Sequence, residues 1–267
     1  MVAHHISLRW LRLPLAFLFL VPVLFAKKER IEPTPVFADV TARGRMLYEC
    51  DQANWHASDA VQALNPPLEL VGRYIARKTG SVWTVGFGRL NEARDKFLVA
   101  YEATQGTTLN NFTVKKIDPP QGDISFYLFA ARALDTALRD FRGEKRPYNA
   151  AVLPTTDDQL YVYVMPAQTK DDVYPLGGDV RYLISPDGNT IVEKRQLHKT
   201  ILENQADSSK GTTHVAGFHT HVLSDVPEDT DVFHVLTQNP PLPEYVGTMS
   251  KKLYIINADG TILQGKL

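Results

Sequence analysis

The sequence of 267 residues contains only one cysteine, Cys50. A single thiol excludes an intrachain disulfide framework and any zinc or iron–sulfur site built from several cysteines. Basic residues beyond the N-terminal segment are dispersed and group only in pairs such as Lys194 and Arg195, so the sequence predicts no nucleic-acid partner. Stability must come from a buried core, and a chain with 44% apolar residues can form one large domain or two small ones.

Two common signals for catalysis or cofactor binding are also missing. Gly86 and Gly88 flank a phenylalanine but lack the third glycine and the helix start of a dinucleotide-binding loop. The sequence contains no nucleophile elbow of the kind that presents a catalytic serine. It therefore predicts no organic cofactor site.

No apolar run is long enough to span a bilayer comfortably. The longest, residues 13–26, has 14 residues, whereas a membrane span needs about 20. Arg9 and Arg12 precede the run and Lys27 follows it, which is the pattern of a secretory signal peptide. We therefore expect residues 1–26 to be a signal peptide cleaved after Ala26, with an uncleaved membrane anchor as the alternative.

Export would place the mature protein outside the cytoplasm, in a periplasm or in the medium. Loss of residues 1–26 removes Arg9 and Arg12 and no acidic residue, so the formal net charge changes from −1 to −3. Apart from a retained anchor, we expect no membrane span.

The rest of the chain divides into three parts by composition. Residues 27–44 contain Pro33 and Pro35 among several charges and predict an extended lead-in. Residues 45–118 and 121–267 predict an N-terminal and a C-terminal α+β region. Pro119 and Pro120 mark the boundary between them, although without a long linker the two halves could share one sheet system.

Hydrophobic periodicity predicts an α+β fold with mainly antiparallel sheets, one long amphipathic helix and a few short helices. Residues 123–142 repeat apolar side chains at three- and four-residue steps, with Asp123 as a candidate cap, and form the long helix. A short helix is expected at residues 58–64. The strand candidates, rich in β-branched and aromatic residues, are 70–76, 81–87, 96–103, 148–153, 160–165, 179–185 and 190–202.

Candidate metal ligands occur between residues 213 and 231. In a strand, alternate side chains share a face, so His219 and His221 should point the same way. Pro227 and the acidic residues behind it predict a helix N-terminus that carries Asp231. Two imidazoles and one carboxylate are ligands that zinc accepts.

This arrangement resembles the JAMM/MPN metalloprotease family, whose motif is a distant glutamate, then His-x-His-Pro, then Ser-x-x-Asp. The resemblance covers about a third of the chain and implies that His219, His221 and Asp231 bind zinc, with a water molecule in the open position. Val222 stands in place of the proline and Glu228 in place of the serine.

The family's upstream catalytic glutamate has no clear counterpart, so we assign no catalytic residue from the sequence. Asp179, Glu193 and Glu203 are the carboxylates that could substitute for it. We interpret His198 as a residue on a strand surface.

Two functions fit this sequence, and they leave open whether the protein is an enzyme. The first is an exported α+β module with a binding or structural role, a protein or peptide partner that the sequence does not identify, and a divalent-metal site. The second is a JAMM-like zinc-dependent peptidase or isopeptidase, active or degenerate. In a third interpretation, the histidines only form hydrogen bonds on a half-exposed sheet.

Overall fold

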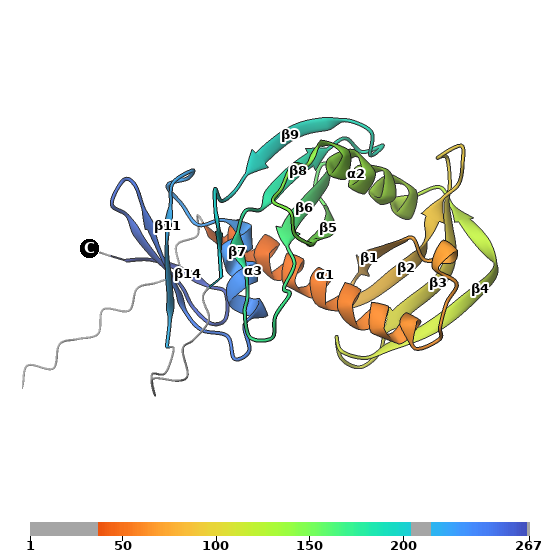
Figure 1. Cartoon of the computed structure of the whole chain (residues 1–267), viewed down its shortest axis with the longest axis horizontal. Helices are drawn as coiled ribbons and strands as arrows, with labels where there is room; N and C mark the ends of the chain where they lie inside the picture. The colour runs from red at the N-terminus through yellow and green to blue at the C-terminus, as the bar shows by residue number, and fades with distance from the viewer. Residues whose placement is uncertain (1–36, 204–214, 266–267) are drawn as a thin grey trace, which may run out of the picture. The chain divides into compact units, whose positions relative to one another are not determined.

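The computed structural model describes residues 37–203 and 215–265, and the predicted signal peptide lies outside them. The described chain confirms the expected α+β class, with mainly antiparallel sheets (Figure 1). The α-helices are α1 (Ala38–Gln62), α2 (Phe126–Asp140) and α3 (Asp229–Thr237), and a 3-10 turn covers Leu68–Leu70.

Two four-stranded antiparallel sheets form the larger part of the described chain. The first sheet is a meander of β1 (Arg73–Thr79), β2 (Val82–Leu90), β3 (Phe97–Gln105) and β4 (Phe112–Asp123). The second sheet has the order β5-β6-β8-β9, made of β5 (Tyr148–Pro154), β6 (Leu160–Pro166), β8 (Val180–Ile184) and β9 (Ile191–Gln196). Most of these strands were expected, to within a few residues at each end. The expected strand 190–202 is wrong, because β9 ends at Gln196, and β4 was not expected.

Helices α1 and α2 cover opposite faces of these two sheets. The hydrophobic cluster that includes the buried face of α1 contains Ala76, Ala151 and Tyr163. The cluster that includes the buried face of α2 contains their neighbours in the strands, Ile75 and Val152. Alternate side chains of a strand point to opposite faces, which explains why neighbours join different clusters. Each cluster contains residues of both sheets, so the expected N-terminal and C-terminal regions pack together and do not form two separate cores.

The structure corrects two boundaries expected from the sequence. Helix α1 begins at Ala38, inside the stretch 27–44 that we expected to be extended, and the predicted short helix 58–64 is only its C-terminal end. The second correction concerns Pro119 and Pro120, which lie within β4 and not in a linker.

Helix α2 confirms the long amphipathic helix, which begins three residues later than expected. Asp123 Oδ1 accepts hydrogen bonds from the backbone N–H groups of Tyr127 and Leu128, at 3.1 and 3.3 Å, so the predicted cap does contact the first turn. Leu138, one of the apolar residues that repeat along this helix, is 38% exposed and so lies partly outside the buried face.

A third four-stranded sheet follows in the C-terminal part. It has the order β11-β12-β13-β14, made of β11 (Gly217–His221), β12 (Glu244–Thr248), β13 (Leu253–Ile256) and β14 (Ile262–Gly265). Strands β11 and β12 are parallel and α3 connects them, as a crossover between parallel strands requires. A two-stranded ladder of β7 (Leu176–Gly177) and β10 (Ile201–Leu202) completes the described strands.

Helix α3 packs closely against α1. A Cβ atom on Gly44 of α1 would lie 2.5 Å from Cβ of Val232, so only glycine permits this approach. At the start of α3, the buried Asp229 forms ion pairs with Arg43 and Arg181 and accepts a hydrogen bond of 2.7 Å from the Tyr163 hydroxyl. These contacts fix the N-terminal turn of α3 against α1 and the β5–β9 sheet.

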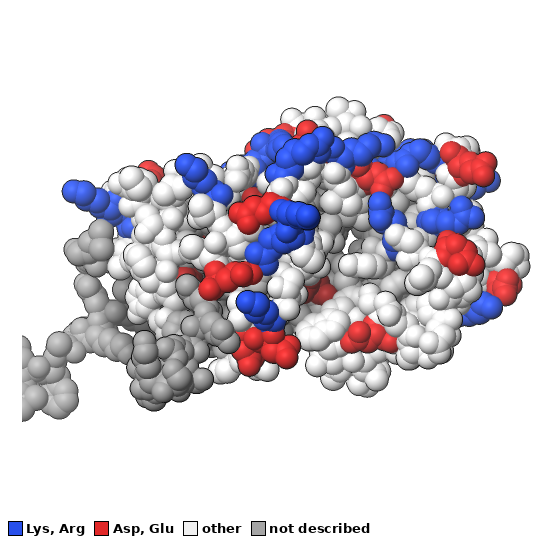
Figure 2. All heavy atoms as spheres, in the orientation of Figure 1, with Lys and Arg blue, Asp and Glu red and all other residues white. Residues whose placement is uncertain are grey.

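Charged side chains of both signs are mixed on the face shown in Figure 2, with Lys and Arg gathered along its β9 edge. On β9, Lys194 is paired with Asp140 and Arg195 with the buried Glu228. In the part of the chain that the structure describes, no helix is both long enough and apolar enough to cross a membrane.

Candidate metal centre

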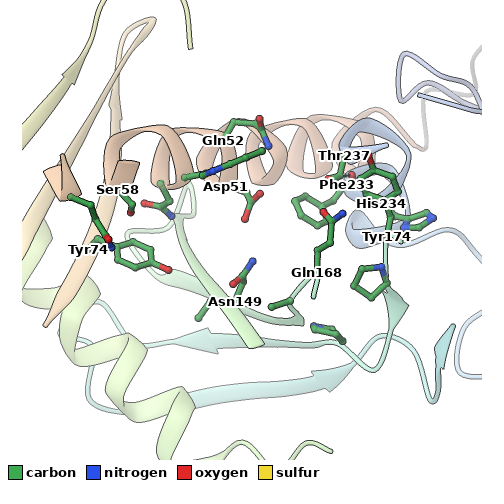
Figure 3. A pocket seen from close by; sticks show the side chains of 17 residues that line it. Asp51, Gln52, Ser58, Tyr74, Asn149, Gln168, Tyr174, Phe233, His234 and Thr237 are labelled. Carbon is green, nitrogen blue, oxygen red and sulfur yellow. Dashed lines mark hydrogen bonds between the residues drawn. The ribbon is translucent and has the colours of Figure 1, made fainter. Parts of the chain in front are cut away.

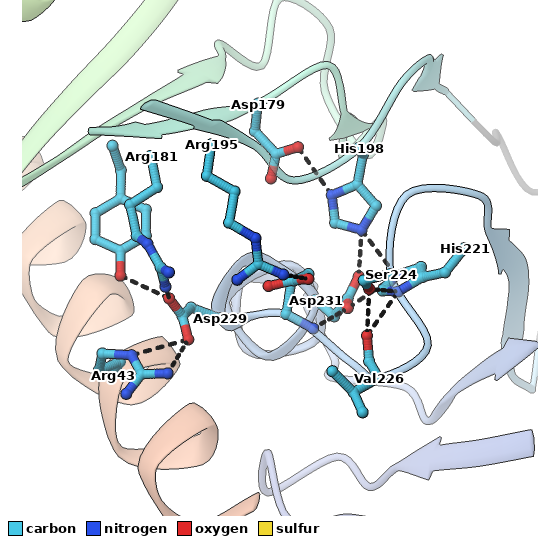
Figure 4. Close-up of polar contacts among 12 residues, drawn as sticks. Arg43, Asp179, Arg181, Arg195, His198, His221, Ser224, Val226, Asp229 and Asp231 are labelled. Carbon is cyan, nitrogen blue, oxygen red and sulfur yellow. Dashed lines mark hydrogen bonds and ion pairs between the residues drawn. The ribbon is translucent and has the colours of Figure 1, made fainter. Parts of the chain in front are cut away.

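Four buried side chains converge where β11, α3 and the β9–β10 connection meet. They are His198, His219, His221 and Asp231, and one potential ligand atom from each lies within 4.8 Å of all the others. Figure 4 shows His198, His221 and Asp231 turned toward one another. The cluster could hold a metal ion.

Local structure explains how the chain positions three of these groups. His219 and His221 face inward from β11, while Phe218 and Thr220, which alternate with them along the strand, are exposed. Asp231 is the third residue of α3, where its carboxylate also accepts a 2.7 Å hydrogen bond from the Glu228 N–H in a capping box. Glu228 is the N-cap, so the helix begins two residues later than the Pro227 start expected from the sequence.

Each imidazole is held through Nδ1 by an acceptor elsewhere in the chain. His198 Nδ1 lies 2.8 Å from Asp179 Oδ1, and His219 Nδ1 lies 2.8 Å from Glu244 Oε1. His221 Nδ1 lies 2.9 Å from the Val226 carbonyl oxygen. Because a carbonyl or carboxylate accepts the Nδ1–H, all three rings have an unprotonated Nε2 when they are neutral. Such acceptors are the usual outer partners of metal-bound histidines.

The Nε2 atoms meet one another and Asp231. His198 Nε2 lies 2.9 Å from His221 Nε2 and 3.0 Å from Asp231 Oδ1, and the Nε2 atoms of His219 and His221 each lie 3.1 Å from an oxygen of Asp231. Two ligands of one tetrahedral zinc ion, each about 2.0–2.1 Å from it, would be roughly 3.3–3.4 Å apart, so these donor atoms would move apart by a few tenths of an ångström to hold zinc. Among the described residues, His219 Nε2 and Asp231 Oδ1 are buried and lie close to each other, but neither is aligned for a well-directed hydrogen bond. A bound cation would satisfy both atoms.

Gly217, on the same strand as His219 and His221, leaves room for one of these outer acceptors. A Cβ atom on Gly217 would lie 1.7 Å from Oε2 of Glu244, its register partner on β12. The missing side chain therefore leaves room for the carboxylate that holds His219.

The electrostatics of the cluster favour positive charge. Burial lowers the pKa of His198, but the charges of Asp179 and Asp231 outweigh burial and raise that pKa well above its usual value. Burial likewise lowers the pKa of His219, yet the adjacent carboxylates of Asp231 and Glu244 raise it to about 9. Three carboxylates around three imidazoles thus attract cations, whether protons or a metal ion.

Burial raises the pKa of Asp231, but the charge and hydrogen bonds of the histidines hold it well below its usual range. Asp231 is therefore ionised at neutral pH and can act as an anionic ligand.

A pocket of about 290 Å³ adjoins the cluster, and His198 and His219 form part of its lining. Its other walls are largely aliphatic, with Leu197, Leu202 and Leu223 among them.

The structure brings together the three residues predicted as metal ligands and adds a fourth. His198 is 7% exposed and lies in the cluster, so its interpretation as a surface residue is wrong. His198 was assigned to the surface because it lies in an alternating strand pattern with lysines nearby. The sequence alone does not show that the chain turns inward after Gln196. Glu244 and the role of Asp179 as a histidine partner were missed for the same reason.

The three carboxylates considered in place of the JAMM catalytic glutamate lie in different surroundings. Asp179 is engaged with His198, Glu193 is exposed on β9, and Glu203 pairs with Arg146.

Comparisons of the chain with family models, with curated proteins and with solved structures return no match. Function must therefore be inferred from the residues and their geometry.

Proposed function

We propose that the protein is an exported module that binds one zinc ion through His198, His219, His221 and Asp231, and that the ion has a structural role. The observation that carries the proposal is the convergence of three Nε2 atoms on one carboxylate while all three Nδ1 atoms are held by acceptors. This arrangement orients every imidazole for a metal before the metal binds.

Zinc fits this donor set best. Three neutral imidazoles and one carboxylate supply four ligands, the number that structural zinc sites use, whereas catalytic sites keep three protein ligands and a water. The side chains of all four ligands are at most 8% exposed. With His198 as the fourth ligand, the position that water takes in a JAMM-type site is filled by protein.

A structural ion at this place would connect distant parts of the chain. Asp231 comes from α3, His219 and His221 from β11, and His198 from the connection that follows β9. One ion would thus join the β11–β14 sheet and α3 to the end of the β5–β9 sheet.

The test is the metal content and stability of the purified full chain. We expect about one equivalent of zinc in the wild type and His56→Ala, and little in His198→Ala and His221→Ala, because a lost ligand abolishes tight binding. A chelator should lower the melting temperature of the wild type by about 10 °C, since an ion at about 1,000 times its dissociation constant contributes about 4 kcal/mol.

His56 is a suitable control because it lies on α1 and stacks on Trp55, outside the cluster. Equal, negligible metal in all four proteins would reject the site, whereas one equivalent of another divalent metal would keep the site and reject zinc.

Hydrolysis is the second candidate function, and the pocket beside His198 and His219 favours it. A JAMM-like enzyme would use His219, His221 and Asp231 as ligands and this pocket for the substrate. Cleavage of peptide or isopeptide substrates by the wild type, lost with a chelator, would support an enzyme. We expect no cleavage, because Asp179 is occupied by His198 and no other described carboxylate is identified as a base.

Export rests on the sequence of residues 1–26. N-terminal sequencing of the native protein should begin at Lys27. An intact Met1 in a soluble cytoplasmic fraction would contradict export without affecting the metal site.

A further inference from the structure

A second polar site lies on the other side of α3, away from the histidine cluster. It is a cavity of about 460 Å³ lined by α1, β1, β5, the end of β6, the connection before β7, and α3 (Figure 3). Its volume is within the usual range for pockets that hold small molecules.

Asp51 gives this cavity a single negative charge. Its carboxylate points from α1 into the space, and no other Asp or Glu and no Lys or Arg lines the cavity within the described chain (Figure 3). Burial raises the pKa of Asp51 to about 6, with only a hydrogen bond to Gln52 acting in the opposite direction. A half-buried carboxylate without a neighbouring cation is unfavourable, so a positive ligand would be stabilised beside it.

The remaining lining groups suit an organic cation. The aromatic rings of Trp55, Tyr74 and Phe233 border the cavity and can bind a cation on their faces. Asn149 and Gln168 project into it opposite Asp51 (Figure 3), and their amide oxygens can accept N–H groups.

Asn54 provides a further acceptor. It also lines the cavity, and its buried Oδ1 has no hydrogen-bond partner among the described residues.

We propose that this cavity binds a small primary amine in its ammonium form, with Asp51 as the counter-ion. A neutral polyol could use the same amides and rings, but it would leave the carboxylate without a cation. The proposal does not depend on the metal site, because none of the four clustered residues lines the cavity.

The test is calorimetric titration of the full chain with n-butylammonium and with 1,4-diaminobutane, and with 1-butanol as the uncharged counterpart. We expect both amines to bind, and 1-butanol to bind at least about tenfold more weakly than n-butylammonium. Asp51→Asn should weaken amine binding at least about tenfold, because it removes the charge and keeps the shape. Trp55→Ala should weaken it roughly threefold by loss of a cation–π contact.

Asp59→Asn is the matched control, because Asp59 is exposed on the same helix and does not line the cavity. It should leave affinity within about twofold of the wild type. The proposal is overturned if neither amine binds at about 10 mM, if Asp51→Asn binds as the wild type does, or if 1-butanol binds as tightly as n-butylammonium.

Discussion

Helix α3 borders two polar sites that are built on opposite principles. On one side, Asp231 faces three imidazoles, and nearly every polar atom around it has a partner at hydrogen-bond distance. On the other side, Phe233 and His234 face a cavity in which Asp51 is the only formal charge among the described lining residues. The first site leaves space for one small ion, whereas the second leaves space for a molecule.

The comparison shows that sites for small and for large ligands are recognised by different structural features. A metal site is recognised by donors that already point at one place and by the outer acceptors that orient them. A cavity for a larger ligand is recognised by its volume and by a charge that the protein does not neutralise.

The largest effect on metal binding and stability should come from removing the charge of Asp231, the carboxylate that faces all three histidines. We expect Asp231→Asn to abolish tight metal binding and to lower the free energy of unfolding by about 3–5 kcal/mol, because it removes one partner from a buried charged group. Urea titration and elemental analysis measure both effects. Asp225→Asn, at a half-exposed carboxylate in the preceding loop, should change neither. Normal zinc content in Asp231→Asn would remove this residue from the site.

A smaller effect should come from the outer partners of the histidines. Asp179→Asn should weaken zinc binding about 10–100-fold and leave the stoichiometry near one, because the amide orients His198 less well than the carboxylate. Competition with a chromogenic chelator measures the affinity. Glu193→Asn, on the exposed side of β9, is the control. Unchanged affinity in Asp179→Asn would show that its contact with His198 does not serve the metal.

The smallest effect, of opposite sign, should come from the cavity. The pKa of Asp51 is raised from 3.8 to about 6 in the folded protein. Between these values the folded state keeps a proton that the unfolded state has lost, so this residue makes stability fall as pH rises from about 4 to 6.

Asp51→Asn removes this penalty and should stabilise the protein by roughly 1–2 kcal/mol at pH 7.5, with almost no gain near pH 4. Urea titrations at the two pH values measure the difference, and Asp59→Asn should show none. A destabilised Asp51→Asn at pH 7.5 would mean that the carboxylate already has a favourable partner.

The sequence predicted most strands of the first two sheets and three clustered residues because both depend on local periodicity, but it did not predict β4 or the strands β12, β13 and β14. The alternation of β11 places His219 and His221 on one face, and the acidic helix start places Asp231 near them. His198 and Glu244 join them only through the long-range packing of strands, which no short pattern records.

Helix α1 was underestimated for a different reason. Its buried positions recur at three- and four-residue steps, but they include Thr41, Gly44 and Asn54, which do not form an apolar stripe. A helix buried by small and polar residues has almost no hydrophobic periodicity to detect.

Gly217 has a consequence for how relatives of this chain can diverge. Any side chain at position 217 would occupy the space of the Glu244 carboxylate. A residue larger than glycine at 217 should therefore displace the Glu244 carboxylate and with it the orientation of His219, so we expect substitutions at the two positions to be correlated among homologues. Glycine at 217 together with glutamate at 244 is thus a signature of an intact site, readable from sequence in any genome that encodes such a protein.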